Sequence, residues 1–251
     1  MNRTELAARN NALWCDAICR AHGGDTRLTE HVWFNRVNSP PFYPNVDTLT
    51  KDGRAAQMGV IQSLLDSPLS AGWGVKDSFC TLDLAPLGFR QLFEAQWLWR
   101  DPEPAQKSPL PEVHWTVIRT PAELVRWEAA WRGPDGDPML NIFLPALLDD
   151  PGTSFLAAIR GGEIVAGVVA TRTGEVVGVS NLFTPPGEKA DFWAGAIAAS
   201  QQTFPGLPLV GYESGEELDI AKSLGFEEIG ALRVWLAPEG KDEFIGIHRN
   251  L

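Results

Sequence analysis

Two carboxyl residues, Asp77 and Glu213, stand at matching places in the two halves of the sequence, each between a short apolar segment and a serine. The apolar segments predict β-strands. A carboxylate at the end of a strand can take a proton from a substrate amine when its pKa is raised toward 7. It can also cap the following helix, since Ser214 and Glu217 have the spacing of a capping box. Both roles remain open, and Tyr212 is a third candidate for proton transfer.

These carboxyl residues belong to a repeat in the sequence. Residues 45–99 and residues 178–236 carry similar segments in the same order, at an offset of about 134 to 137 positions. A steady offset predicts that the chain contains two copies of one folding unit. The matching positions include Leu49 and Phe183, Gly53 and Gly187, and Gly88-Phe89 and Gly225-Phe226.

The hydrophobic pattern predicts an α+β fold in two units. Residues 101–112 carry four prolines and no apolar periodicity, which predicts an extended linker. We therefore expect a shortened N-terminal unit at residues 1–100 and a complete C-terminal unit at residues 113–251. Helices are predicted at residues 5–21, 54–65, 82–87, 120–131, 141–148, 188–203 and 215–224. Strands are predicted at residues 31–37, 42–49, 72–79, 90–99, 113–118, 207–212 and 228–236, with three more between residues 155 and 183.

Three motifs in the second half give it a resemblance to a known family. They are the hairpin AAIRGGEIVAGVVA, the strand end NLFTP before a helix, and the helix end AKSLGF before the last strand. Together with the order of elements, they resemble the GNAT superfamily of GCN5-related N-acetyltransferases over residues 113–237. The resemblance implies a mixed central sheet flanked by helices, acetyl-CoA as co-substrate and acetyl transfer to an amine.

The resemblance also implies where acetyl-CoA binds. In the family, two parallel strands diverge, the pantetheine arm lies along the exposed strand edge, and the pyrophosphate binds the amides that begin the next helix. Unpaired amides and the helix dipole favour anions there. The residues implied for the pantetheine and acyl carbonyl are Leu182, Phe183 and Thr184. Those implied for the pyrophosphate are Gly187, Glu188, Lys189 and Ala190.

The sequence departs from the family pattern in the phosphate loop. One alignment puts Glu188 where the family has Arg or Gln. A carboxylate that faces the pyrophosphate at 4 Å costs roughly 1–4 kcal/mol of Coulomb energy. The first copy keeps Arg54 and Gly59 of the pattern, so either copy is a candidate for the CoA site.

Many family members have a tyrosine that protonates the leaving thiolate. The equivalent positions in the second and first copies here are Ala221 and Leu84, which cannot donate a proton. Catalysis would then rely on positioning and water.

Composition limits the partners of the protein. The formal net charge of −11 disfavours nucleic acid and anionic membranes, which require cationic patches. No segment reaches the roughly 20 apolar residues of a membrane span, and no signal peptide is evident. Three cysteines do not make a disulfide framework, so we expect a cytoplasmic protein with reduced thiols. Cys15 and Cys19 are expected to face the core, and no metal site is predicted.

We therefore expect an acyl-CoA-dependent N-acetyltransferase with a small-molecule amine as acceptor and Glu213 as the general base. One alternative is a degenerate relative that binds CoA or another ligand without turnover. In another alternative the first copy is purely structural and acts as a lid or as the surface of a homodimer. The phosphate loop discriminates between these hypotheses, because its loss favours the degenerate protein.

Overall fold

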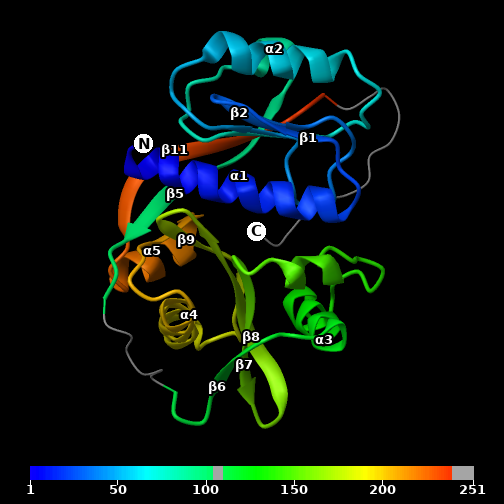
Figure 1. Ribbon diagram of the computed structural model, residues 1–251. Helices are drawn as coiled ribbons and strands as arrows, with labels where there is room; N and C mark the ends of the chain where they lie inside the picture. The colour runs from blue at the N-terminus through cyan, green and yellow to red at the C-terminus, as the bar shows by residue number, and fades with distance from the viewer. Residues whose placement is uncertain (104–109, 239–251) are drawn as a thin grey trace.

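The computed structural model describes residues 1–103 and 110–238. Within these residues, eleven strands form a single mixed sheet (Figure 1). The N-terminal half contributes β1 (Thr26–Leu28), β2 (Val32–Asn35), β3 (Val46–Thr48), β4 (Gly74–Asp77) and β5 (Arg90–Arg100). The C-terminal half contributes β6 (His114–Val117), β7 (Thr153–Arg160), β8 (Glu163–Thr173), β9 (Val176–Phe183), β10 (Leu209–Glu213) and β11 (Glu227–Leu236). The strand order is β1-β2-β3-β4-β11-β5-β10-β9-β8-β7-β6.

Helices cover both faces of this sheet. One face carries α1 (Arg3–Ala21) and α3 (Pro121–Arg132), whose apolar residues share one core cluster. The other face carries α2 (Arg54–Leu65) over the N-terminal half, and α4 (Lys189–Thr203) and α5 (Gly215–Ser223) over the C-terminal half. Two short 3₁₀ helices lie in connections: η1 (Ala85–Leu87) and η2 (Pro145–Asp149). No helix in the described ranges is long and apolar enough to span a membrane.

Local sequence signals explain several helix ends. α3 begins with the predicted N-cap Thr120 and with Pro121 as its first residue, and Glu123 completes a capping box. α2 begins and ends at the predicted residues. The helix predicted at 141–148 is wrong for most of its length, because only the short 3₁₀ helix η2 forms there. Strand β1 was not predicted, since three residues give too little pattern.

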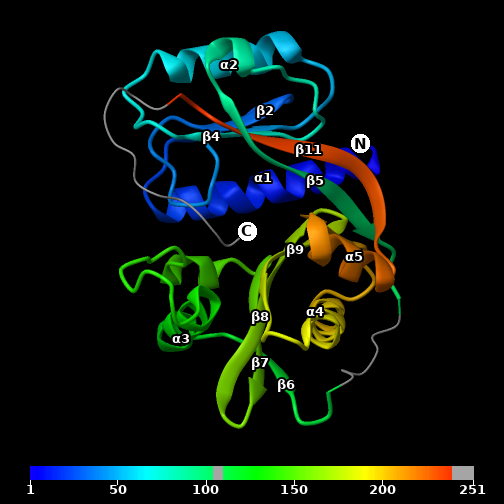
Figure 2. The same ribbon diagram turned by 180° about the vertical axis from the view of Figure 1, so that it is seen from behind.

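The two halves exchange their last strands. β5, from the N-terminal half, lies between β10 and β11, and β11 lies between β4 and β5. Figure 2 shows β5 (green) and β11 (orange to red) running side by side from one half into the other. The sheet therefore continues across the domain boundary predicted at residues 101–112, and residues 104–109 of that linker lie outside the described residues.

Each half contains a parallel pair of strands connected by a helix. β3 and β4 are parallel with α2 between them in sequence, and β9 and β10 are parallel with α4 between them. The two strand–helix–strand units, at residues 46–77 and 176–213, cover the first part of the segments matched by the sequence repeat. That they descend from one repeated unit remains an interpretation of the sequence similarity.

The strand exchange predicts that the halves unfold together. Leu98 of β5 is 1% exposed and packs in the core cluster under α4, so Leu98→Ala should lower the free energy of unfolding by about 2–5 kcal/mol. Chemical denaturation followed by far-UV circular dichroism and tryptophan fluorescence should give one coincident transition, shifted in the variant. The control is Leu92→Ala on the same strand, where the side chain is 37% exposed and a change within about 0.5 kcal/mol is expected. Two separate transitions would contradict a shared core.

Candidate functional site

The candidate site lies where β9 and β10 diverge. The two strands pair through Leu209 with Val177 and Val210 with Gly178. Beyond these pairs, β10 continues along β5 and β9 continues along β8. A bulge shifts the register of β9 on β8, and Asn181 within it has a positive φ of 52°. The edge of β9 that faces β10 is therefore left without a strand partner among the described residues over positions 179–183.

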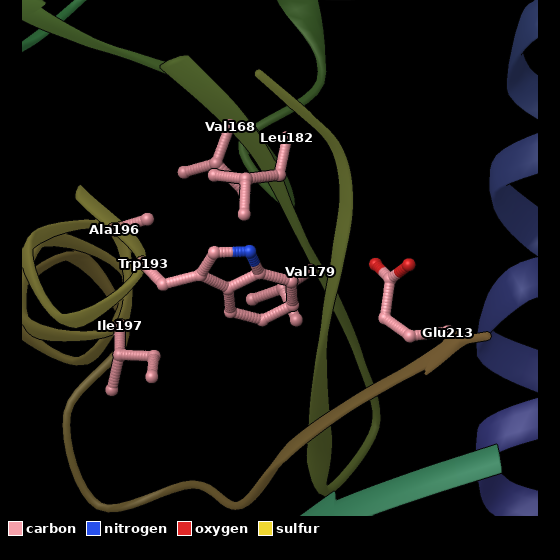
Figure 3. Close-up of a pocket in the computed structure, with 7 residues that line it drawn as sticks. All are labelled: Val168, Val179, Leu182, Trp193, Ala196, Ile197 and Glu213. Carbon is pink, nitrogen blue, oxygen red and sulfur yellow. The ribbon is translucent and has the colours of Figure 1, made fainter. Parts of the chain in front are cut away.

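A small hollow opens at this divergence, on the α4 side of the sheet (Figure 3). Its walls are apolar except for one carboxyl group, that of Glu213. The lining residues are Val168, Val179, Leu182, Trp193, Ala196, Ile197 and Glu213. The Trp193 indole, 4% exposed, fills much of the space between the strands and α4, and its Nε1 donates to Glu217 Oε2 at 2.8 Å.

Glu213 has an unusual environment for a carboxyl group. No hydrogen bond or ion pair joins it to any other described residue. Ser214, the N-cap of α5, makes no side-chain capping bond, and Glu213 does not cap the helix either. Burial, with a smaller contribution from the nearby Glu217 carboxylate, raises the pKa of Glu213 from 4.5 to about 8. The group therefore titrates in the range that a general base requires.

The matching carboxyl group of the first half has a structural role. Asp77 is fully buried and accepts hydrogen bonds from the amides of Leu82 at 2.8 Å and Phe79 at 3.4 Å. Burial raises the pKa of Asp77, and these backbone hydrogen bonds oppose the increase. The carboxylate thus holds the turn after β4, and it does not cap a helix, since η1 begins only at Ala85 and has no side-chain cap. Two residues at equivalent positions therefore differ in chemistry, because only Glu213 has no partner.

Tyr212, the other catalytic candidate, points to the opposite face of β10. Its ring meets the Trp97 ring edge-on, with centroids 5.4 Å apart, and the Lys76 ammonium lies 4.9 Å from the ring centroid. Burial raises the pKa of Tyr212, while the Lys76 charge opposes that increase. Glu213 and Tyr212 therefore lie on two sides of one strand end.

The N-terminus of α4, where the sequence analysis places a phosphate site, follows the divergence. The amides of residues 187–190 have no acceptor among the described residues. Glu188 forms a two-pronged ion pair with Arg160 of β7, at 2.9 Å for both hydrogen bonds. Lys189 donates to Glu216 and Glu217 of α5, at 2.7 Å each. Arg160 offsets the charge of Glu188, and the Lys189 cation is already shared by two carboxylates.

The strand residues implied by the resemblance have different surroundings. Leu182 lines the hollow together with Glu213. The Phe183 ring instead packs edge-on against Trp127 beneath α3, with centroids 5.2 Å apart. Thr184 follows the end of β9, before the turn at Gly187, which has a φ of 85°. The hollow thus brings together Leu182, Glu213 and Trp193.

The corresponding loop of the first half is held by its own side chains. Gln57 is fully buried and its Nε2 donates to the carbonyls of Thr50 at 2.9 Å, Asp52 at 3.2 Å and His31 at 3.3 Å. The two residues of the first half that match the family pattern, Arg54 and Gly59, take no part in these hydrogen bonds. Arg54 is an exposed first residue of α2, and Gly59 lies on the exposed side of the second turn, where no neighbour requires a glycine.

Two features of the site were not predicted from the sequence. Arg160 reaches Glu188 from a hairpin strand that is 28 residues earlier in the chain, and no motif marks that pairing. Trp193 fills the divergence, a role that depends on tertiary packing. Cys15 and Cys19 are buried in the core, as expected. The described residues contain no group of three or more side chains suited to a metal ion.

Comparison with known proteins identifies the fold. No family profile matches the sequence, and neither does any curated protein sequence. Solved structures are similar over nearly the whole chain. A GCN5-related N-acetyltransferase from Kribbella flavida has 16% identity and a TM-score of 0.59, covering 93% of this chain and 96% of its own. Another, from Sphaerobacter thermophilus, has 11% identity and a TM-score of 0.54, covering 94% of both chains. The chain thus has the fold of GCN5-related N-acetyltransferases, as predicted, over both halves.

The environment of Glu213 predicts a pH-dependent stability. Between about pH 4.5 and about pH 8 the folded protein holds the Glu213 proton that the unfolded chain releases, so the free energy of unfolding falls as pH rises. Glu213→Gln removes this contribution. The stability of the variant relative to wild type should therefore increase from about pH 5 to about pH 9, by on the order of a few kcal/mol.

Urea denaturation at several pH values measures this difference. Glu175→Gln, at an exposed turn between β8 and β9, is the matched control and should show no pH-dependent difference. A constant difference between Glu213→Gln and wild type across this range would show that the carboxyl group has an ordinary pKa.

Proposed function

We propose that the protein is an acyl-CoA-dependent N-acyltransferase that transfers an acetyl group to the amine of a small molecule. The observation that carries this proposal is the unpartnered Glu213 carboxyl, with a pKa of about 8, in the hollow between two diverging strands. The fold shared with N-acetyltransferases supports the reaction class.

The backbone around the divergence fits an acyl-CoA. The free edge of β9 at residues 179–183 presents peptide groups that can pair with the amides of a pantetheine arm. The open amides of residues 187–190 suit a pyrophosphate, and Arg160 neutralises Glu188 beside them. Bound acetyl-CoA supplies an activated acyl group.

Glu213 performs the proton transfer on the acceptor. An amine must be neutral to attack a thioester, and the Glu213 carboxylate accepts the proton that the amine loses. A pKa of about 8 makes this carboxylate a stronger base than an exposed glutamate. The other residues that line the hollow beside Glu213 are apolar. Tyr212, on the other face of β10, is the second proton-transfer residue.

The acceptor is proposed to be a small, positively charged amine. The net charge of −11 attracts cations over distances up to the screening length of about 8–10 Å and repels polyanions. We propose no role for nucleic acid or a membrane surface.

A degenerate, non-catalytic ligand-binding protein is the second candidate. The observation that favours it is the Trp193 indole, which occupies the divergence and is fixed by its hydrogen bond to Glu217. Lys189, the cation nearest the proposed pyrophosphate site, is also engaged by two carboxylates. In this alternative, acyl-CoA or another ligand binds without turnover.

Calorimetric titration with acetyl-CoA and with free CoA tests binding first. We expect micromolar binding that Lys189→Glu abolishes, because the substitution puts a negative charge at the start of α4. Arg54→Glu in the first half is the matched charge reversal and should leave binding intact. The opposite pattern would move the site to the first half. No heat up to millimolar ligand in folded protein would reject the acyltransferase and favour the degenerate protein.

Glu213→Gln tests the proposed base. An acetyl-transfer assay on a panel of amines should show kcat/KM reduced by roughly 10²–10⁴-fold, the usual contribution of a general base, while calorimetric CoA affinity is retained. In the wild type, kcat/KM should rise with pH through about 8 and then level off, and the variant should lose this limb. Glu175→Gln is the control. A variant with wild-type rate and pH profile would exclude Glu213 as the base.

A further inference from the structure

A buried cation from the N-terminal half lies against Tyr212, the residue that precedes Glu213 in β10. Lys76 of β4 is 4% exposed, and its Nζ lies 4.9 Å from the centroid of the Tyr212 ring on β10. Its Nζ also donates to Asn11 Oδ1 of α1. The nearest carboxylate oxygen, Asp47 Oδ1 on β3, is 3.9 Å away. Elements from both halves therefore surround one ammonium group.

This arrangement is costly if its only role is to stabilise the fold. A buried ion pair repays its desolvation only when the geometry is good and the remaining polar atoms are satisfied. Asp47 is 1% exposed, and both of its carboxylate oxygens lack a hydrogen-bond partner among the described residues. The Lys76–Asp47 distance of 3.9 Å is too long for a hydrogen bond. The ammonium instead lies against the electron-rich ring of Tyr212, where a desolvated cation–π contact is favourable.

Lys76 and Tyr212 occupy corresponding positions in the two halves. Each immediately precedes the carboxyl residue that ends its strand, Asp77 in β4 and Glu213 in β10. The chain contains two tyrosines, and the other one, Tyr43, also reaches this region, with its hydroxyl 3.5 Å from Asn181 Oδ1. The N-terminal half thus supplies a charge directly beside the residue that neighbours the proposed base.

We propose that Lys76 is a positioning residue for Tyr212, contributed by the N-terminal half to the site of the C-terminal half. The inference rests on the proposed function, in which Tyr212 takes part in proton transfer. The ammonium fixes the ring and stabilises the phenolate form of Tyr212. Under this proposal the N-terminal half is neither a lid nor only a dimer surface, because β4 supplies the charge that lies beside Tyr212.

Several charged or titratable groups act on Tyr212. Burial makes the largest contribution and raises its pKa; Lys76 lowers it, while Cys15 of α1, Glu213 of β10 and Asp47 of β3 raise it. Removal of the Lys76 charge and removal of the Asp47 charge should therefore move the pKa of Tyr212 in opposite directions.

Fluorine NMR of protein labelled with fluorotyrosine tests the proposal. Tyr43→Phe leaves Tyr212 as the single labelled residue, and fluorination lowers the pKa of the phenol, which offsets the increase that burial causes. In this background, Lys76→Met should raise the titration midpoint by roughly 1 pH unit or more, as expected for loss of a cation at this distance. Asp47→Asn should lower the midpoint, and Lys76→Arg should keep it near that of the parent.

A second variant guards against misfolding. If Lys76→Met leaves Asp47 unpaired and fails to fold, Asp47→Asn combined with Lys76→Met removes both charges and should still raise the midpoint, because Lys76 has a larger effect on the pKa of Tyr212 than Asp47 has. Circular dichroism at each pH confirms the folded state. Equal midpoints in the parent, Asp47→Asn and the folded Lys76 variants would overturn the proposal. The titration needs neither acetyl-CoA nor turnover, so its outcome is separate from the tests of the proposed function.

Discussion

The structure depends on the hydrogen bonds that place β5 and β11 inside one another's halves. β5 pairs with β10 along Leu209–Glu213, and β11 pairs with β4 along Gly74–Asp77. Backbone groups that would otherwise be left at open sheet edges are satisfied in this way. The cores follow the same exchange, since Leu98 of β5 packs under α4 and Trp235 of β11 packs under α2. The halves cannot slide or rotate without breaking this ladder, and the positions of Lys76 and Tyr212 follow from it.

Local sequence decides what each strand end does within this frame. After Asp77 the chain turns back, and the amides of Phe79 and Leu82 point at the carboxylate. After Glu213 the chain enters α5 directly, so no amide reaches the side chain. Both carboxyl groups are desolvated, but hydrogen bonds stabilise the charged form of Asp77 and nothing similar acts on Glu213. A repeated position thus becomes a structural anchor in one half and a titrating group in the other.

The order and type of most elements could be predicted from the sequence, because long amphipathic segments and caps such as Thr120 are local signals. The equivalence of Asp77 and Glu213 was also visible in the sequence. The contacts that distinguish them were not, since they depend on which amides face each carboxylate. Likewise the Arg160–Glu188 pair and the place of Lys76 against Tyr212 join strands that only the sheet order brings together. The exchange of β5 and β11 had no sequence signature, because strand partners are chosen by tertiary packing.

The strand exchange also affects the order in which the protein can fold as it is synthesised. β4 finds its partner β11 only after the segment carrying Arg233 has left the ribosome, since Asp77 pairs with that residue. Until its C-terminal partners are made, the N-terminal half exposes one unpaired edge of β4 and both edges of β5, and these edges are open to wrong partners. Pairing between segments so far apart in sequence is slow because a long loop must close first. The N-terminal half, although it is synthesised first, can complete its sheet only when β11 has been made. Chaperone binding at the exposed edges would protect the nascent chain during that interval.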